Sequence, residues 1–156
     1  MANFIRINQH PALEQHAHFE HEIGKITQIK IFINTVYQMK IEIHSINNLK
    51  IAEIISDTIL LRTIEDGIDL IGNISYQGFD KMIIHEKNIT PDFFELKTKI
   101  AGDILQKFAQ YQMPLTIIGE FSKFGSKSLN DFIYESNKGK QINFANSIEE
   151  AIQKFC

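Results

Sequence analysis

Two short apolar runs about 30 residues apart constrain the fold more than any other feature of the chain. They are KMIIHE from Lys81 and LTIIGEF from Leu115, and each is apolar on consecutive residues. Such a run is typical of a strand that is covered on both faces of a sheet. Between them, residues 91–111 carry apolar side chains at spacings of three and four, which predicts a long helix. Strand, helix and strand in this order predict parallel strands with a right-handed crossover.

Patterns on both sides extend this unit over residues 39–156. Residues 39–45 and 49–56 predict two strands of a hairpin, because the turn-forming pair Asn47-Asn48 separates them. Three further helices are predicted from their capping pairs, which are Thr63 with Asp66, Ser128 with Asp131, and Ser147 with Glu150. The segment QINFAN predicts a fifth strand. The expected fold is α/β, with a mixed, mainly parallel five-stranded sheet, an opening hairpin and about four helices.

Residues 1–38 differ from the rest of the chain. QHPALEQHAHFEHE is polar and rich in histidine, whereas ITQIKIFINTVYQ has the composition of one more strand. One interpretation is a loosely attached N-terminal extension, with Met39 as the natural start of translation. The other is an added edge strand or an arm that binds a partner, including a second copy in a homo-oligomer.

Composition excludes several classes of function. The net charge is −3 with acids and bases interspersed, which argues against nucleic acid as a partner. No apolar stretch approaches the roughly 20 residues that span a bilayer, so we expect no membrane partner. The single cysteine, Cys156, allows no intramolecular disulfide and favours a cytoplasmic location. The sequence indicates no cofactor and leaves the oligomeric state open.

Three segments carry a family resemblance: IIHEKNITPDFFELKTKIAGDILQKF, GEFSKFGSKSLNDFIYESNKGKQINF and SIEEAIQKF. They resemble a bacterial family catalogued as domain of unknown function 4180, over roughly residues 39–156. That family lends no activity. The order of elements is also similar to the STAS domain, the fold of anti-sigma-factor antagonists and of the cytoplasmic ends of sulfate transporters. This second resemblance implies a regulatory module that binds a protein partner.

In the STAS family, a Ser or Thr that begins the helix after the third strand is phosphorylated by a partner kinase. Thr90 occupies the corresponding place, although NITPD at residues 88–92 replaces the Asp-Ser-x-Gly pattern of that family. One interpretation therefore makes Thr90 a phosphoacceptor that switches partner binding. A second makes Thr90 the N-cap of a helix, followed by Pro91 at the first helical position and by Asp92 near the positive helix end.

A third interpretation of the same region is catalytic. His85 and Glu86 would form an acid/base pair at the carboxyl end of a strand, with Asp57 from a neighbouring strand end, because open α/β sheets gather ligands there. Adjacent strand residues point to opposite faces, which separates His85 from Glu86 if the strand extends that far. This interpretation predicts a small-molecule binder or an enzyme.

The loop after the second apolar run is the remaining candidate surface. Its residues, together with Asp92, form a predicted interaction surface: Phe121, Ser122, Lys123, Phe124 and Ser126. In the N-terminal segment, His16, His18 and His21 have donor atoms for a metal ion but lack the ligand spacing of a zinc site. We therefore interpret that segment as solvated.

Overall fold

The computed structural model describes residues 24–26 and 39–156. The chain divides into two compact units, Met1–Gln38 and Met39–Cys156. In the first unit, residues 24–26 are helical. The predictions of an extra strand, a partner-binding arm and a histidine cluster in residues 1–23 and 27–38 lie outside the described residues. None of the helices among the described residues is both long enough and apolar enough to cross a bilayer.

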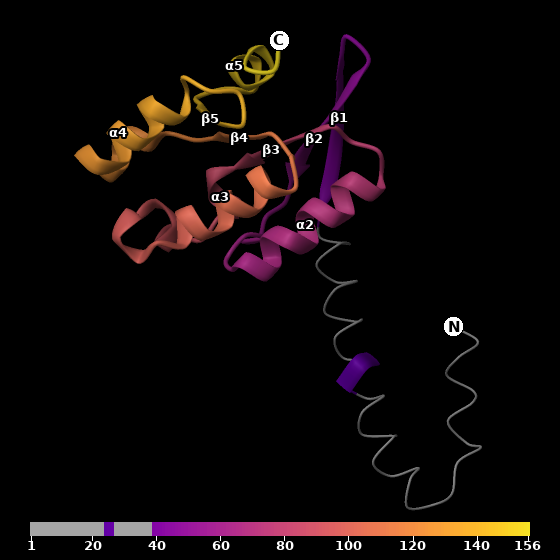
Figure 1. The fold of residues 1–156 in the computed structure, drawn as a ribbon, viewed down its shortest axis with the longest axis horizontal. Coiled ribbons are helices and arrows are strands. Elements are labelled where there is room, and N and C mark those ends of the chain that lie inside the picture. The colour runs from indigo at the N-terminus through magenta and orange to yellow at the C-terminus, as the bar shows by residue number, and fades with distance from the viewer. Residues whose placement is uncertain (1–23, 27–38) are drawn as a thin grey trace, which may run out of the picture. The chain divides into compact units, whose positions relative to one another are not determined.

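A five-stranded sheet forms the centre of the second unit, with the strands in chain order (Figure 1). The strands are β1 (Lys40–Ile46), β2 (Leu49–Ile55), β3 (Lys81–His85), β4 (Leu115–Ile118) and β5 (Ile142–Ala145). β1 and β2 pair antiparallel, and all later neighbours pair parallel. Both apolar runs are interior strands, β3 and β4, as their consecutive apolar residues predicted.

Three helices cover one face of the sheet and a fourth covers part of the other. The helices are α2 (Ile64–Tyr76), α3 (Ile100–Gln110), α4 (Lys127–Ser136) and α5 (Ile148–Gln153). From β2 to β5 each crossover moves one strand in the same direction, so right-handed crossovers place α2, α3 and α4 on the same face. The short α5 follows the last strand and packs against β4 and β5 from the opposite side (Figure 1). The predicted α/β fold is confirmed.

The local signals of the hairpin and of α2 are confirmed as well. Asn47 and Asn48 both have positive φ angles, 49° and 69°, as a tight hairpin turn requires. Thr63 accepts a hydrogen bond from the Asp66 N–H, and the Asp66 carboxylate accepts one from the Thr63 N–H. These reciprocal bonds satisfy backbone groups that a helix start leaves unpaired.

Two predicted helix starts are wrong. α4 is capped by Ser126, whose hydroxyl accepts from the Leu129 N–H, and not by Ser128. The helix expected over residues 91–111 begins only at Ile100, after the 3-10 turns Pro91–Phe94 and Leu96–Thr98. At Lys99 the backbone adopts a left-handed φ of 68°, which separates the 3-10 turns from α3. Tertiary packing explains the irregular segment. The 3-10 turn buries both Phe93 and Phe94, whereas an amphipathic α-helix would point one of two successive side chains away from the core.

The two faces of the sheet bury separate apolar clusters. The larger lies under α2, α3 and α4 and contains the alternate strand residues Ala52, Ile54, Met82, Ile84, Leu115, Ile117 and Phe144. The smaller lies under α5 and is built from Ile51, Ile83, Ile118, Ala145, Ala151 and Phe155. Strand alternation therefore assigns every strand residue to one of two layers, and Glu53 and His85 fall on the α5 side.

Candidate functional site

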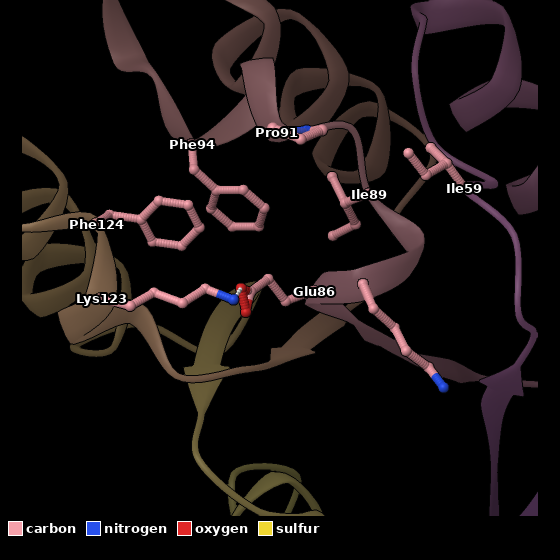
Figure 2. A pocket seen from close by; sticks show the side chains of 8 residues that line it. Ile59, Glu86, Ile89, Pro91, Phe94, Lys123 and Phe124 are labelled. Carbon is pink, nitrogen blue, oxygen red and sulfur yellow. Dashed lines mark ion pairs between the residues drawn. The ribbon is translucent and has the colours of Figure 1, made fainter.

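A pocket of about 190 Å³ opens where β3 and β4 end (Figure 2). Its lining comes from the loop after β2 and from the segments after β3 and β4: Ile59, Glu86, Lys87, Ile89, Pro91, Phe94, Lys123 and Phe124. Carboxyl ends of adjacent parallel strands meet at one edge of the sheet, so the connections that follow them converge there. Segments that lie about 30 residues apart in the sequence therefore form one concave surface.

Aromatic stacking forms one wall of the pocket. The Phe94 ring, from the 3-10 turn after β3, stacks on the Phe124 ring, from the 3-10 turn Phe121–Phe124 after β4. Their centroids are 4.9 Å apart with an interplanar angle of 18° (Figure 2). Phe121 lies beneath them, buried against Phe94 and Phe144. Aromatic pairs contribute about 1 kcal/mol beyond the burial of their surface, so this stacking stabilises the wall.

An ion pair joins the same two segments beside that wall. The Lys123 ammonium lies 2.5 Å from the Glu86 carboxylate, which is largely buried, while Lys123 itself is half-exposed. Gly119 makes the approach possible, since a Cβ atom at this position would lie 2.7 Å from the Glu86 Cβ. The neighbouring Lys87 is exposed and makes no ion pair within residues 39–156. The pocket thus combines apolar walls with one neutralised pair and one unpaired cation at its rim.

Asn88 holds the third side of the pocket in place. Its side chain has no exposed surface, and its amide donates to the carbonyls of Ser56 and Thr58 at 2.7 and 2.8 Å. Its own backbone carbonyl accepts from the N–H groups of Leu60 and Leu61. These four bonds tie the loop after β2 to the turn after β3 and thereby fix Ile59 at the pocket.

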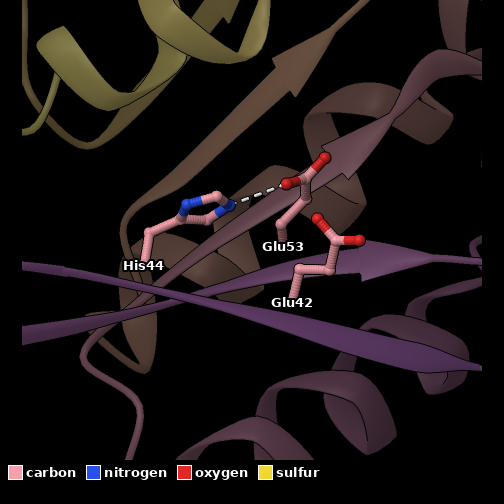
Figure 3. Close-up of side chains that lie close together, drawn as sticks. All are labelled: Glu42, His44 and Glu53. Carbon is pink, nitrogen blue, oxygen red and sulfur yellow. Dashed lines mark hydrogen bonds and ion pairs between the residues drawn. The ribbon is translucent and has the colours of Figure 1, made fainter.

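His85 faces away from the pocket, toward the α5 side of the sheet. Its Nε2 lies 2.9 Å from Glu53 Oε1, and His44 Nε2 lies 2.7 Å from Glu53 Oε2. Glu42 stands directly opposite Glu53 across the β1–β2 ladder (Figure 3). Glu53 is only 5% exposed, so three adjacent strands enclose one carboxylate between two imidazoles.

The electrostatics of Glu53 follow from this enclosure. Burial raises the pKa of Glu53. Hydrogen bonds from His44 and His85, together with the attraction of their charges, lower this pKa by more than burial raises it. The net result is a pKa below the ordinary value of a glutamate. Glu53 therefore remains an anion at neutral pH in spite of its burial.

The structure separates some of the predicted site residues and assembles others. Glu86 and Lys123 meet in the pocket, whereas His85 contacts a different carboxylate on the other face. Asp57 is exposed in the bend after β2 and lies outside the pocket lining. Thr90 is half-buried, makes no side-chain capping hydrogen bond and directly precedes Pro91 at the pocket.

The predicted interaction surface is divided in the same way. Phe124 and Lys123 line the pocket, and Phe121 is buried beneath it. Ser122 is exposed between Phe121 and Lys123, and Asp92 is exposed next to the pocket residue Pro91. Ser126 caps α4.

Sequence reasoning missed the Glu42, His44 and Glu53 group. Glu42 and His44 are two residues apart in an alternating strand, which places both on one face, and the hairpin register then brings Glu53 opposite them. That signal was present in the sequence, but pairing with His85 required the crossover order that only the folded sheet supplies.

Comparison with known proteins identifies a family. A family model described as "Domain of unknown function (DUF4180)" matches residues 46–155. No curated protein and no solved structure matches the chain.

Proposed function

The chain belongs to the DUF4180 family, and we propose that it is a cytoplasmic, STAS-like regulatory module that binds a protein partner through the pocket after β3 and β4. The partner inserts one large apolar side chain between the Phe94–Phe124 wall and Ile59. An acidic residue beside that side chain pairs with Lys87 at the rim.

The size of the pocket carries this proposal. Pockets that bind cofactors and drug-sized ligands enclose roughly 300–1,000 Å³. The pocket here has about 190 Å³, which suits a single side chain better than a whole ligand. Protein interfaces concentrate their binding energy in such anchors, which fill well-packed aromatic or aliphatic pockets. Glu86 and Lys123 already pair with each other, so the pocket offers a partner mainly apolar contact.

Charge favours the second part of the proposal. Lys87 is exposed at the rim and unpaired among the described residues, and Lys123 also projects its cation over the Phe124 ring at 5.4 Å. A partner with Asp or Glu next to its anchor meets a favourable field, while a basic partner is repelled. Rim charges of this kind act mainly on the association rate and on partner choice.

Selection from a peptide-display library tests the proposal with purified protein. We expect enriched peptides to share one large apolar residue adjacent to Asp or Glu. Phe124→Ala should weaken an enriched peptide about tenfold, because it removes half of the aromatic wall. Tyr134→Ala is the matched control, since Tyr134 is an exposed aromatic of α4 outside the pocket and its loss should leave the affinity unchanged.

Two charge-reversal variants test the role of Lys87 at the rim of the pocket. Lys87→Glu should weaken the peptide severalfold, and more at low salt, whereas Lys97→Glu alters an exposed lysine outside the pocket and should have no effect. Peptides without a common pattern, or with affinities indifferent to Phe124 and Lys87, contradict the proposal. If only small organic fragments bind at these residues, the protein is a small-molecule binder instead.

We further propose that Thr90 regulates this binding. Its hydroxyl caps no helix, its side chain is partly exposed, and the next residue, Pro91, lines the pocket. A phosphate on Thr90 would add about two negative charges beside the site for the partner's acidic residue, and repulsion would lower the affinity. The position of Thr90 relative to the third strand, as in STAS domains, supports the same role.

Paired substitutions separate regulation from structure. Thr90→Glu should weaken the selected peptide, while Thr90→Ala should not, because the backbone N–H bond from Thr90 to Leu61 is present in both. Equal affinities for the two variants would remove Thr90 from the proposal and leave the pocket unaffected.

A further inference from the structure

We propose that Glu42, His44 and Glu53 form a binding site for a divalent transition metal ion, with Zn²⁺ as the preferred ion. One donor atom from each of these residues lies within 4.8 Å of the other two (Figure 3). The site lies on the α5 side of the sheet at β1 and β2. It is thus separate from the pocket that binds the proposed partner.

The positions of the three donors are set by the hairpin register. Glu42 pairs with Glu53 across the ladder, and His44, two residues on, projects from the same face of β1. Residues directly opposite in an antiparallel pair have Cβ atoms about 5 Å apart, within reach of a single ion. Donors on paired strands are held more rigidly than donors on loops, which favours a defined geometry.

Binding an ion requires the donor side chains to rotate, because their donor atoms are not yet at the spacing of a metal site. A tetrahedral zinc site has metal–ligand distances of about 2.0–2.2 Å, which places its donor atoms roughly 3.3–3.6 Å from one another. The His44 Nε2 and Glu53 Oε2 atoms share a hydrogen bond of 2.7 Å, so an ion would replace its proton, which is released to solvent, and separate the two atoms slightly. Glu42 is about half-exposed and free to bring its carboxylate closer by a change of rotamer.

Charge provides a second, independent argument. Two carboxylates directly opposite on one face repel each other, and Glu53 is almost completely buried. Lys40 offsets part of this charge, but its ammonium lies 3.6 Å from Glu42 and both side chains are well exposed. His44 and His85 hydrogen-bond the Glu53 oxygens, but only a divalent cation between the two carboxylates would neutralise Glu42 and Glu53 together.

The donor types select the ion. Magnesium and calcium prefer all-oxygen sites, whereas an imidazole nitrogen with carboxylate oxygens suits zinc and its neighbours. His85 would act as a positioning residue, because it donates to Glu53 Oε1 and so orients the carboxylate, while Oε2 faces His44. Histidine–carboxylate contacts of this kind orient metal ligands in known sites. Three protein ligands leave a fourth position for water, and partial exposure of His44 gives solvent a path to it.

Calorimetric titration of the full-length, metal-free protein with ZnCl₂ tests the site. The titration uses the variant His16→Ala, His18→Ala, His21→Ala as background, so that the other histidine cluster cannot supply the signal. We expect one Zn²⁺ per chain, unaffected by millimolar Mg²⁺, and a four-coordinate visible spectrum when Co²⁺ replaces zinc. The affinity should fall at least a hundredfold in His44→Gln and Glu42→Gln and about tenfold in His85→Gln.

Two further variants distinguish ligation from a structural role. Lys40→Ala should raise the affinity severalfold, because it removes a cation that competes for Glu42. Glu65→Gln removes an exposed acid of α2 and should change nothing. Circular dichroism checks that each variant is folded. The proposal is overturned if the background variant binds no Zn²⁺, or if His44→Gln and Glu42→Gln bind it as tightly as the background does.

Discussion

Gly119 offers the sharpest test of how the pocket is assembled. The methyl group of Gly119→Ala would lie 2.7 Å from the Glu86 Cβ, 3.1 Å from Glu86 Oε1 and 3.1 Å from the Phe121 ring. Real Cβ atoms do not approach each other to 2.7 Å, so either the turn after β3 or the end of β4 must move. The Glu86 Cβ is fixed to the backbone, and a change of rotamer cannot relieve the contact.

The expected cost follows from two opposing effects. Overpacking of this kind destabilises proteins by about 1–3 kcal/mol. Against it, alanine lowers the entropy of the unfolded chain and contributes about 0.4–1 kcal/mol, since Gly119 does not require a positive φ angle. We therefore expect Gly119→Ala to lower the free energy of unfolding by about 1–2 kcal/mol. Displacement of Glu86 should also weaken its ion pair with Lys123 and lower the affinity of the selected peptide for the pocket.

Urea unfolding followed by circular dichroism measures the first effect. Gly72→Ala is the matched control, because Gly72 lies inside α2 with no atom within 4 Å of the added methyl. That variant should gain about 0.5–1 kcal/mol from the better helix propensity of alanine. If Gly119→Ala is as stable as the wild type and binds the peptide equally well, the close approach of Glu86 is not what shapes the pocket.

Three further predictions concern polar groups that are buried or partly buried. Asn88→Ala should cost about 2 kcal/mol in urea unfolding, because two buried carbonyls lose their donor, and an unchanged midpoint contradicts this. Asn137→Ala should cost about 1–2 kcal/mol and raise the hydrogen exchange of the Phe144 amide, since the Asn137 side chain pairs with both backbone groups of Phe144 on edge strand β5. In metal-free protein, the folded-state pKa of Glu53 is lowered, so its contribution is complete above the unfolded value of about 4.3 and is lost as pH falls through the folded pKa. The stability difference between wild type and Glu53→Gln should therefore shrink on acidification, and a constant difference from pH 7 to pH 3 opposes the reasoning.

The sequence by itself determined the elements and their order. Consecutive apolar residues identified β3 and β4 as interior strands, and the Asn47-Asn48 pair and the Thr63–Asp66 capping box defined the hairpin and the start of α2. These features depend on contacts between residues close in the chain or on a simple choice between buried and exposed faces. Local propensity and hydrophobic period therefore suffice to reveal them.

Only the tertiary structure decided which side chains meet. Glu86 meets Lys123, and His85 meets Glu53, through strand order and register that no local pattern encodes. The same packing overrode local signals in residues 91–98, where burial of Phe93 and Phe94 produced 3-10 turns in place of the first two turns of a helix. A site requires side chains from distant segments to lie close together. Whether they do depends on every crossover and strand register between those segments. That is why the fold followed from the sequence, whereas the pocket and the Glu53 cluster required the folded chain.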